Sequence, residues 1–151
     1  MPMPAVIDIR DVTAADEADW RRLWSGFLAH YDVTLEAGIT DFTWTRLLDA
    51  QNPLAARIAC LDGSAMGFAI HQLHPSTWVM GEDCYLEDLF VAQEARGQGI
   101  GRALIEDLKA VARAKGAKRL HWFTDAGNRR ARALYDQLAE RDGHIRYRTI
   151  L

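Results

Sequence analysis

The feature that most constrains this chain is a glycine-rich stretch at residues 94–104, EARGQGIGRAL, which leads directly into a helical pattern. Gly97, Gly99 and Gly101 occupy every second position. Glycine adopts left-handed backbone conformations at little cost and lets a ligand approach the amide groups closely. A strand that turns through glycines into a helix presents unbonded N–H groups at the positive end of the helix dipole, where phosphates commonly bind. The stretch therefore predicts an anion-binding turn.

Two familiar phosphate motifs do not fit these glycines. The spacing is not Gly-x-Gly-x-x-Gly, and no acidic ribose ligand follows a second strand at the right distance. A Walker loop is excluded because no Gly-Lys-Ser/Thr sequence is present. The alternative is a turn that only tightens a strand-to-helix corner. The neighbouring Arg96 and Arg102 favour the anion site.

The charge of the chain is distributed unevenly. Residues 1–95 contain five Lys/Arg and fifteen Asp/Glu, a balance of -10, whereas residues 96–151 contain thirteen and six, a balance of +7. These charges either solvate the surface or mark a site where a polyanion binds the C-terminal half and a cation meets the N-terminal half. A net charge of -3 without a basic stripe argues against nucleic acid as a partner.

Length and composition indicate one domain spanning residues 1–151, of ordinary globular type. No apolar run approaches the length of a membrane span, and the N-terminus lacks the pattern of a secretion signal. Cys60 and Cys84 do not form a disulfide framework, so we expect a cytoplasmic protein with reduced thiols and no membrane partner. His71, His74 and His121 lack the spacing of metal ligands, and we expect no metal site.

The hydrophobic pattern predicts six strands and four helices. Two- and three- to four-residue periodicities give strands at 6–12, 55–61, 65–73, 84–91, 119–124 and 144–151, and helices at 14–29, 40–50, 99–115 and 128–139. Antiparallel strands in the first half followed by β-α-β units predict a mixed sheet flanked by helices.

Three linked motifs resemble the GCN5-related N-acetyltransferase (GNAT) family. Residues 96–101 (RGQGIG) match its Arg/Gln-x-x-Gly-x-Gly/Ala signature, and residues 128–135 (NRRARALY) match its second motif, Asn with Tyr seven positions later. Residues 85–91 (YLEDLFV) are similar to the polyamine and diamine acetyltransferases, and the C-terminal sequence resembles a yeast branch once described as histone acetyltransferases. The resemblance implies an α/β (α+β) GNAT fold, with a mixed, mostly antiparallel sheet of six to seven strands and about four helices.

The resemblance also implies that the polyanion is acetyl-coenzyme A. Its pyrophosphate would bind the amides of residues 97–102, and its pantetheine arm would pair with the backbone of β-strand residues 89 and 91. The implied cofactor-binding residues are Leu89, Val91, Arg96, Gly97, Gln98, Gly99, Gly101, Arg102 and Asn128.

The same motifs indicate two catalytic residues. Tyr135 would be the general acid that protonates the departing thiolate, and Glu87 would be the base that takes the proton of the amine, directly or through a water molecule. The structural alternatives are a core aromatic at Tyr135 and a carboxylate at Glu87 that holds a turn or an arginine. Asp88 is adjacent but, in a regular strand, points to the opposite face.

We expect an N-acetyltransferase that acts on a small cationic amine, such as a polyamine or an amino acid. Many aromatic and acidic residues in the first half favour a cation as the acceptor. The alternatives are acetylation of a protein lysine or N-terminus, and a non-catalytic module, either one that binds coenzyme A or an interaction domain. The final strand would place Ile145, Tyr147, Thr149 and Leu151 on one face of a sheet edge, from which we expect a homodimer.

Overall fold

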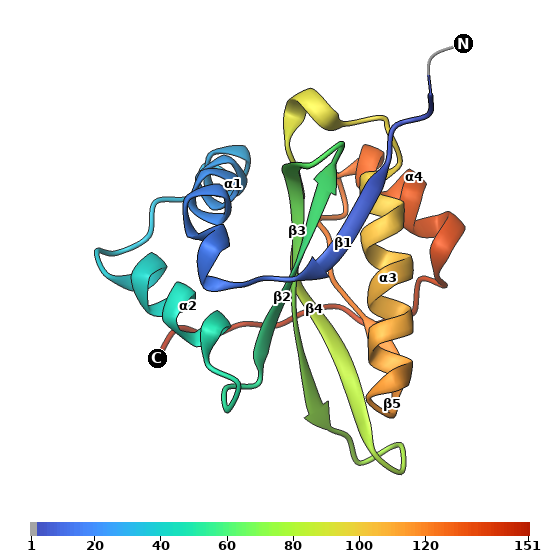
Figure 1. Cartoon of the computed structure of the whole chain (residues 1–151). Coiled ribbons are helices and arrows are strands. Elements are labelled where there is room, and N and C mark those ends of the chain that lie inside the picture. Colours follow the sequence, from blue (N-terminus) through green and yellow to red (C-terminus); the bar gives the residue numbers. More distant parts are fainter. Residues whose placement is uncertain (1–2) are drawn as a thin grey trace.

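A computed structural model describes residues 3–151 as one mixed sheet with helices on both sides (Figure 1). The strand order is β1-β2-β3-β4-β5; neighbours are antiparallel except β4 and β5, which are parallel. The elements are β1 (Ile7–Asp11), η1 (Ala14–Asp16), α1 (Glu17–His30), α2 (Ile39–Leu48), β2 (Leu54–Leu61), β3 (Ser64–Pro75), β4 (Glu82–Val91), η2 (Gln93–Ala95), α3 (Ile100–Ala114), β5 (Ala117–His121) and α4 (Arg129–Leu138). Within the described residues, no helix is sufficiently long and apolar to span a bilayer.

Two hydrophobic clusters hold the helices on opposite faces of the sheet. On one face, Trp20 of α1 stacks on Trp24 at 5.3 Å between ring centroids and on Trp44 of α2 at 5.1 Å. On the other face, α3 buries Leu104 and Leu108 completely against the strands, as its periodicity predicts. The sheet is therefore sandwiched between α1 and α2 on one side and α3 and α4 on the other (Figure 1).

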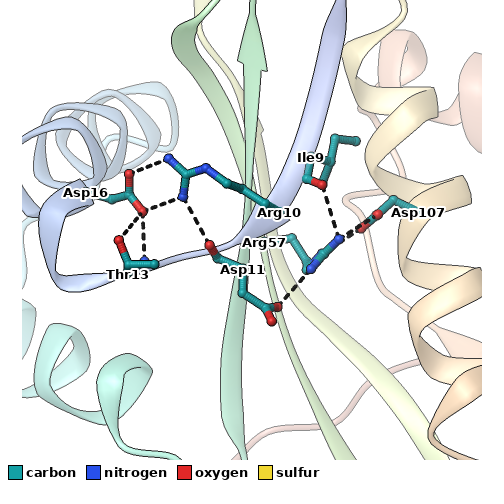
Figure 2. A network of polar contacts seen from close by, with 7 residues as sticks. All are labelled: Ile9, Arg10, Asp11, Thr13, Asp16, Arg57 and Asp107. Atoms are coloured by element: carbon teal, nitrogen blue, oxygen red, sulfur yellow. Dashed lines mark hydrogen bonds and ion pairs between the residues drawn. The ribbon is translucent and has the colours of Figure 1, made fainter.

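A polar network fixes the first strand between these two layers (Figure 2). Arg10 of β1 forms two hydrogen bonds of 2.8 Å with Asp16, just before α1, and their pairing lowers the pKa of Asp16 to about 2. Arg57 of β2 contacts Asp11 of β1 and Asp107 of α3, with a distance of 2.9 Å to each carboxylate. These bidentate arginines connect the sheet to the helices on both of its faces.

The predicted mixed, mostly antiparallel sheet with four helices is confirmed, but the strand count is lower. The described residues form five strands, and the segment 144–151, predicted as a strand, is irregular. Alternation alone does not make a strand, because the backbone also needs a neighbour to supply hydrogen bonds. Instead of running along β5, the C-terminal segment crosses the molecule toward α2 (Figure 1). The strand predicted at 119–124 is β5, which begins and ends earlier, at Ala117 and His121.

Buried His71 makes the folding stability depend on pH. Its side chain is 2% exposed, neither ring nitrogen has a partner, and burial, with Lys115 and Arg57 nearby, lowers its pKa to about 4. Between pH 6.5 and 4 the unfolded chain binds a proton that the folded chain does not, so stability falls as the pH falls. We expect a loss of up to about 3 kcal/mol from this residue.

Urea unfolding at pH 7 and pH 4.5 measures this loss. His71→Leu should remove most of the difference attributable to the imidazole, whereas His30→Ala, which alters an exposed histidine, should keep it. An unchanged pH dependence in His71→Leu would show that His71 is not the responsible group.

Candidate active site and cofactor cleft

The strands β4 and β5 separate halfway along β4. They pair only from Glu82 to Tyr85 on β4, whereas β4 continues to pair with β3 as far as Val91. Among the residues that the structure describes, no strand lies beside residues 86–91 on the β5 side, so backbone groups there are open. Leu89 and Val91 lie in this open segment, where the sequence predicted the coenzyme arm to pair.

The glycine turn lies at the end of this open segment. Gly97 and Gly99 have positive φ angles of 80° and 84°, and no atom lies within 4 Å of the place where a side chain would begin. Gly99 immediately precedes α3, and the first helical hydrogen bond is donated by Ala103 to the Gly99 carbonyl at 3.0 Å. The amides of residues 100–102 are therefore free of helical partners, and Gln98 is exposed in the turn.

Gly101 differs from Gly97 and Gly99 because neighbouring side chains pack closely against it. A Cβ atom at this position would lie 3.4 Å from Leu134 of α4 and 3.9 Å from Val91 of β4. The first turn of α3 thus packs closely between the end of β4 and α4. This packing makes the free amides contiguous with the open edge of β4.

The two arginines of the turn have protein partners. The Nε of Arg96 donates to the Val91 carbonyl at 3.2 Å, and the guanidinium lies 5.8 Å from the Phe90 ring. Arg102 donates to Gln137 of α4. The structure thus places Arg96 against the open segment of β4. Arg102 contacts α4 instead, so the two arginines do not lie at one position.

Asn128 and Tyr135 are both positioned by α4. Asn128 caps this helix, because its Oδ1 accepts a hydrogen bond from the Ala131 amide at 3.2 Å. Tyr135 is half-buried and packs edge-on against Trp122, with 5.4 Å between ring centroids. Burial, with a smaller contribution from Tyr31, raises the pKa of Tyr135 to about 12.

Tyr31 follows the last residue of α1 and is an aromatic residue to which sequence reasoning assigned no particular role. Its pKa is raised by burial and by the charges of Asp125 and Asp88. Tyr31 is therefore close enough to both Tyr135 and Asp88 for electrostatic coupling. Its sequence position carries no signal for this, because the three residues meet only through the tertiary fold.

An irregularity in the β3–β4 pairing places two carboxylates together. Ile70 pairs with Asp88 and His71 pairs with Leu86, so Glu87 is an additional residue on β4. Both Glu87 and Asp88 consequently line the same pocket. The prediction that Asp88 points to the opposite face is wrong, because it assumed an unbroken alternation along β4.

This pocket, of about 480 Å³, lies between α2 and the strands β2 to β4. Its lining residues are Trp24, Leu35, Ile39, Thr43, Arg46, Asn52, Pro53, Leu54, Ile70, Gln72, Glu87 and Asp88. The side-chain amide of Gln72 donates to Glu87 at 3.3 Å. Burial and the neighbouring Glu87 raise the pKa of Asp88 to about 7. A carboxyl group that titrates near neutral pH suits proton transfer.

The strand register also brings together His74, Asp83 and His121, which are far apart in sequence. One ligand atom from each lies within 4.8 Å of the others. The sequence did not reveal this proximity. Arg119 already binds both oxygens of Asp83, at 2.9 and 2.6 Å, so the negative charge of this cluster is paired within the protein.

Comparison with known proteins identifies the family. The model of the acetyltransferase (GNAT) family matches residues 16–139. The D-amino-acid N-acetyltransferase HPA3 of Saccharomyces cerevisiae is 30% identical over 144 residues, which are 94% of this chain and 89% of the yeast protein. The thialysine N-epsilon-acetyltransferase of Bos taurus is 39% identical over 77 residues, 51% of this chain and 45% of that protein.

Solved structures support the fold. The structure of AAC(6')-Iy in complex with the bisubstrate analogue CoA-S-monomethyl-acetylneamine superposes with a TM-score of 0.76 at 23% identity, covering 97% of this chain and 99% of that one. The separated strands, the glycine turn and the match of the family model over most of the sequence agree with one another. The chain therefore belongs to the GNAT family of N-acetyltransferases.

Proposed function

We propose that this protein transfers the acetyl group of acetyl-coenzyme A to a small cationic amine, such as an amino acid or a polyamine. The observation that carries the proposal is the position of β4 between two unlike sites. Its open edge and the free amides of the glycine turn suit an extended anionic cofactor, whereas its bulge presents Glu87 and Asp88 to a separate pocket. The relatives named for D-amino acids and thialysine support an amine acceptor.

Acetyl-coenzyme A would supply the acetyl group as a thioester. The amides of residues 97–102 would bind its pyrophosphate, since they lie at the positive end of α3. Leu89 and Val91 would hydrogen-bond the pantetheine arm with their backbones, and the side-chain N–H group of Asn128 would donate near the thiol end. The Val91 carbonyl already accepts one hydrogen bond from Arg96, so a second from the pantetheine arm would use its other lone pair.

The reaction requires three proton transfers. The ammonium group of the acceptor gives its proton to a carboxylate of the Glu87–Asp88 pair, because only the neutral amine is nucleophilic. The amine nitrogen then bonds to the thioester carbon and loses a second proton to water, and the carbon–sulfur bond breaks as the tetrahedral intermediate collapses. Tyr135 gives its proton to the leaving thiolate. The raised pKa of Tyr135 keeps its phenol protonated at neutral pH.

Thiol release from acetyl-coenzyme A tests this function. The acceptors are offered as separate pools of amino acids, polyamines, lysine-containing peptides and aminoglycosides. Release with amino acids or polyamines, together with a mass increase of one acetyl group on the acceptor, would support the proposal. Release only with peptides would indicate a protein acetyltransferase. Coenzyme A binding without release in any pool would indicate a non-catalytic module.

Replacing Tyr135 with Phe should lower kcat about tenfold or more, because the thiolate loses its proton donor. Coenzyme A affinity should change little, since the ring and its contact with Trp122 remain. Steady-state kinetics and calorimetric titration of coenzyme A measure the two effects. A wild-type kcat in Tyr135→Phe would remove this residue from the mechanism.

The two carboxylates are distinguishable by the pH dependence of kcat/KM. If Asp88 must be ionised, the wild-type kcat/KM rises with pH through about 7. Asp88→Asn should then lose this rise of kcat/KM together with most of the activity. Because the charge of Glu87 raises the pKa of Asp88, Glu87→Gln should shift the rise to lower pH.

A loss of activity in Glu87→Gln with no shift of the rise would identify Glu87 as the base, as the sequence predicted. Full activity in both single variants would contradict a carboxylate base in this pocket. Wild-type melting temperatures for both variants would exclude misfolding as the cause.

We propose that the protein is a homodimer in which the C-terminal segment contacts the partner. Ile145, Tyr147 and Ile150 are each more than three quarters exposed in one chain. These apolar side chains lie in a segment that has no strand partner, and a second copy would cover them. Sedimentation at micromolar concentration should give a dimer, and Tyr147→Asp should give a monomer. A monomeric wild-type protein would contradict the proposal.

A further inference from the structure

The pocket between α2 and the strands β2 to β4, here called the acceptor pocket because we propose that the amine binds there, contains charged side chains of both signs that form no ion pair among the described residues. Arg46 projects from α2, while Glu87 and Asp88 project from β4 on the opposite wall. Among residues 3–151, the side chains that form ion pairs within 4.0 Å include none of these three. One pocket therefore offers a cationic end and an anionic end that do not neutralise each other.

The guanidinium of Arg46 is held in place by its own helix. Ile39, Thr43 and Arg46 follow one another on the face of α2 that lines the pocket. The guanidinium lies 4.4 Å from the Phe42 ring centroid and donates to the Thr43 hydroxyl at 3.1 Å. A stacked, hydrogen-bonded guanidinium has little rotational freedom left to lose when an anion binds.

The Nε of Arg46 is buried and has no hydrogen-bond partner within the described part of the chain. A buried N–H group of a charged side chain without an acceptor is unfavourable, and a carboxylate can accept from Nε and a terminal nitrogen together. Gln72 and Trp24, which also line the pocket, are already engaged with Glu87 and Thr40. Arg46 thus retains unused hydrogen-bonding capacity at the wall of the pocket.

We propose that Arg46 binds the carboxylate of the acceptor, and that the acceptor is a zwitterionic amino acid whose amine lies at Glu87 and Asp88. This inference rests on the proposed acetyltransferase function. A polyamine would bring a second cation toward Arg46 and leave its Nε without an acceptor. An amino acid carries an ammonium group and a carboxylate, one for each wall of the pocket.

Paired substrates test the specificity. The kcat/KM values of D- and L-methionine and D- and L-phenylalanine are compared with those of their primary amides and with putrescine. An amide has the same side chain but no carboxylate, and its α-amine, with a pKa of about 8, is intrinsically easier to deprotonate. We expect the wild-type enzyme nevertheless to favour at least one amino acid over its amide by about ten- to a hundredfold.

Arg46→Met should abolish this ratio by lowering kcat/KM for the amino acid while leaving that for the amide nearly unchanged. Arg46→Lys should retain part of the ratio, because lysine keeps the positive charge but lacks the two adjacent N–H donors of the guanidinium. Arg21→Met is the matched control, since Arg21 pairs with Glu17 and Asp41 outside the pocket and should keep the wild-type ratio. Melting temperatures establish that each variant is folded.

Two results would overturn the inference without affecting the proposed function. One is a wild-type enzyme that uses amides or putrescine as well as amino acids, and the other is an unchanged ratio in Arg46→Met. Failure of every amine to release thiol would instead refute the proposed function, and this inference with it.

Discussion

The separation of β4 from β5 after Tyr85 is the constraint on which the site depends. Had the two strands continued to pair, the backbone of Leu89 and Val91 would be satisfied within the sheet and would present nothing to a ligand. Separation leaves these groups open, and α3 begins beside them because Gly101 allows close packing against Val91 and Leu134. Backbone geometry, rather than any one side chain, thus creates the site that we propose for the cofactor.

A second irregularity, the bulge at Glu87, places two carboxylates of β4 in the pocket beneath α2. The additional residue directs Asp88 into the pocket beneath α2, where burial and Glu87 raise its pKa to about 7. The same short strand therefore faces the proposed cofactor along its edge and the proposed acceptor from one face. The acidic N-terminal half and the basic C-terminal half of the sequence agree with this division, since α2 and β4 precede the glycine turn and α3 and α4 follow it.

The local elements were predictable from sequence because their signals are local. The periodicities of α3 and α4 each depend on a few adjacent residues. The family was predictable because its motifs are contiguous, and the family match and the relatives confirm it. The prediction of a C-terminal strand was wrong because a strand needs a hydrogen-bonded neighbour, which alternation of residues does not specify.

The content of the acceptor pocket was less accessible from sequence. The position of Asp88 depends on a register shift in the pairing of β3 with β4. Arg46 carries no motif, and its buried, unpartnered Nε is visible only in three dimensions. Features that depend on tertiary register, rather than on neighbouring residues, thus account for what the sequence did not reveal.

Hydrogen–deuterium exchange with and without coenzyme A tests the central claim most directly, because the claim concerns backbone amides. Coenzyme A should slow exchange at residues 97–102 and along the open segment 86–91, and should leave β1 and β2 unchanged. Protection of these two segments together would place the cofactor between the separated strands. Coenzyme A binding without protection of either segment would contradict the account.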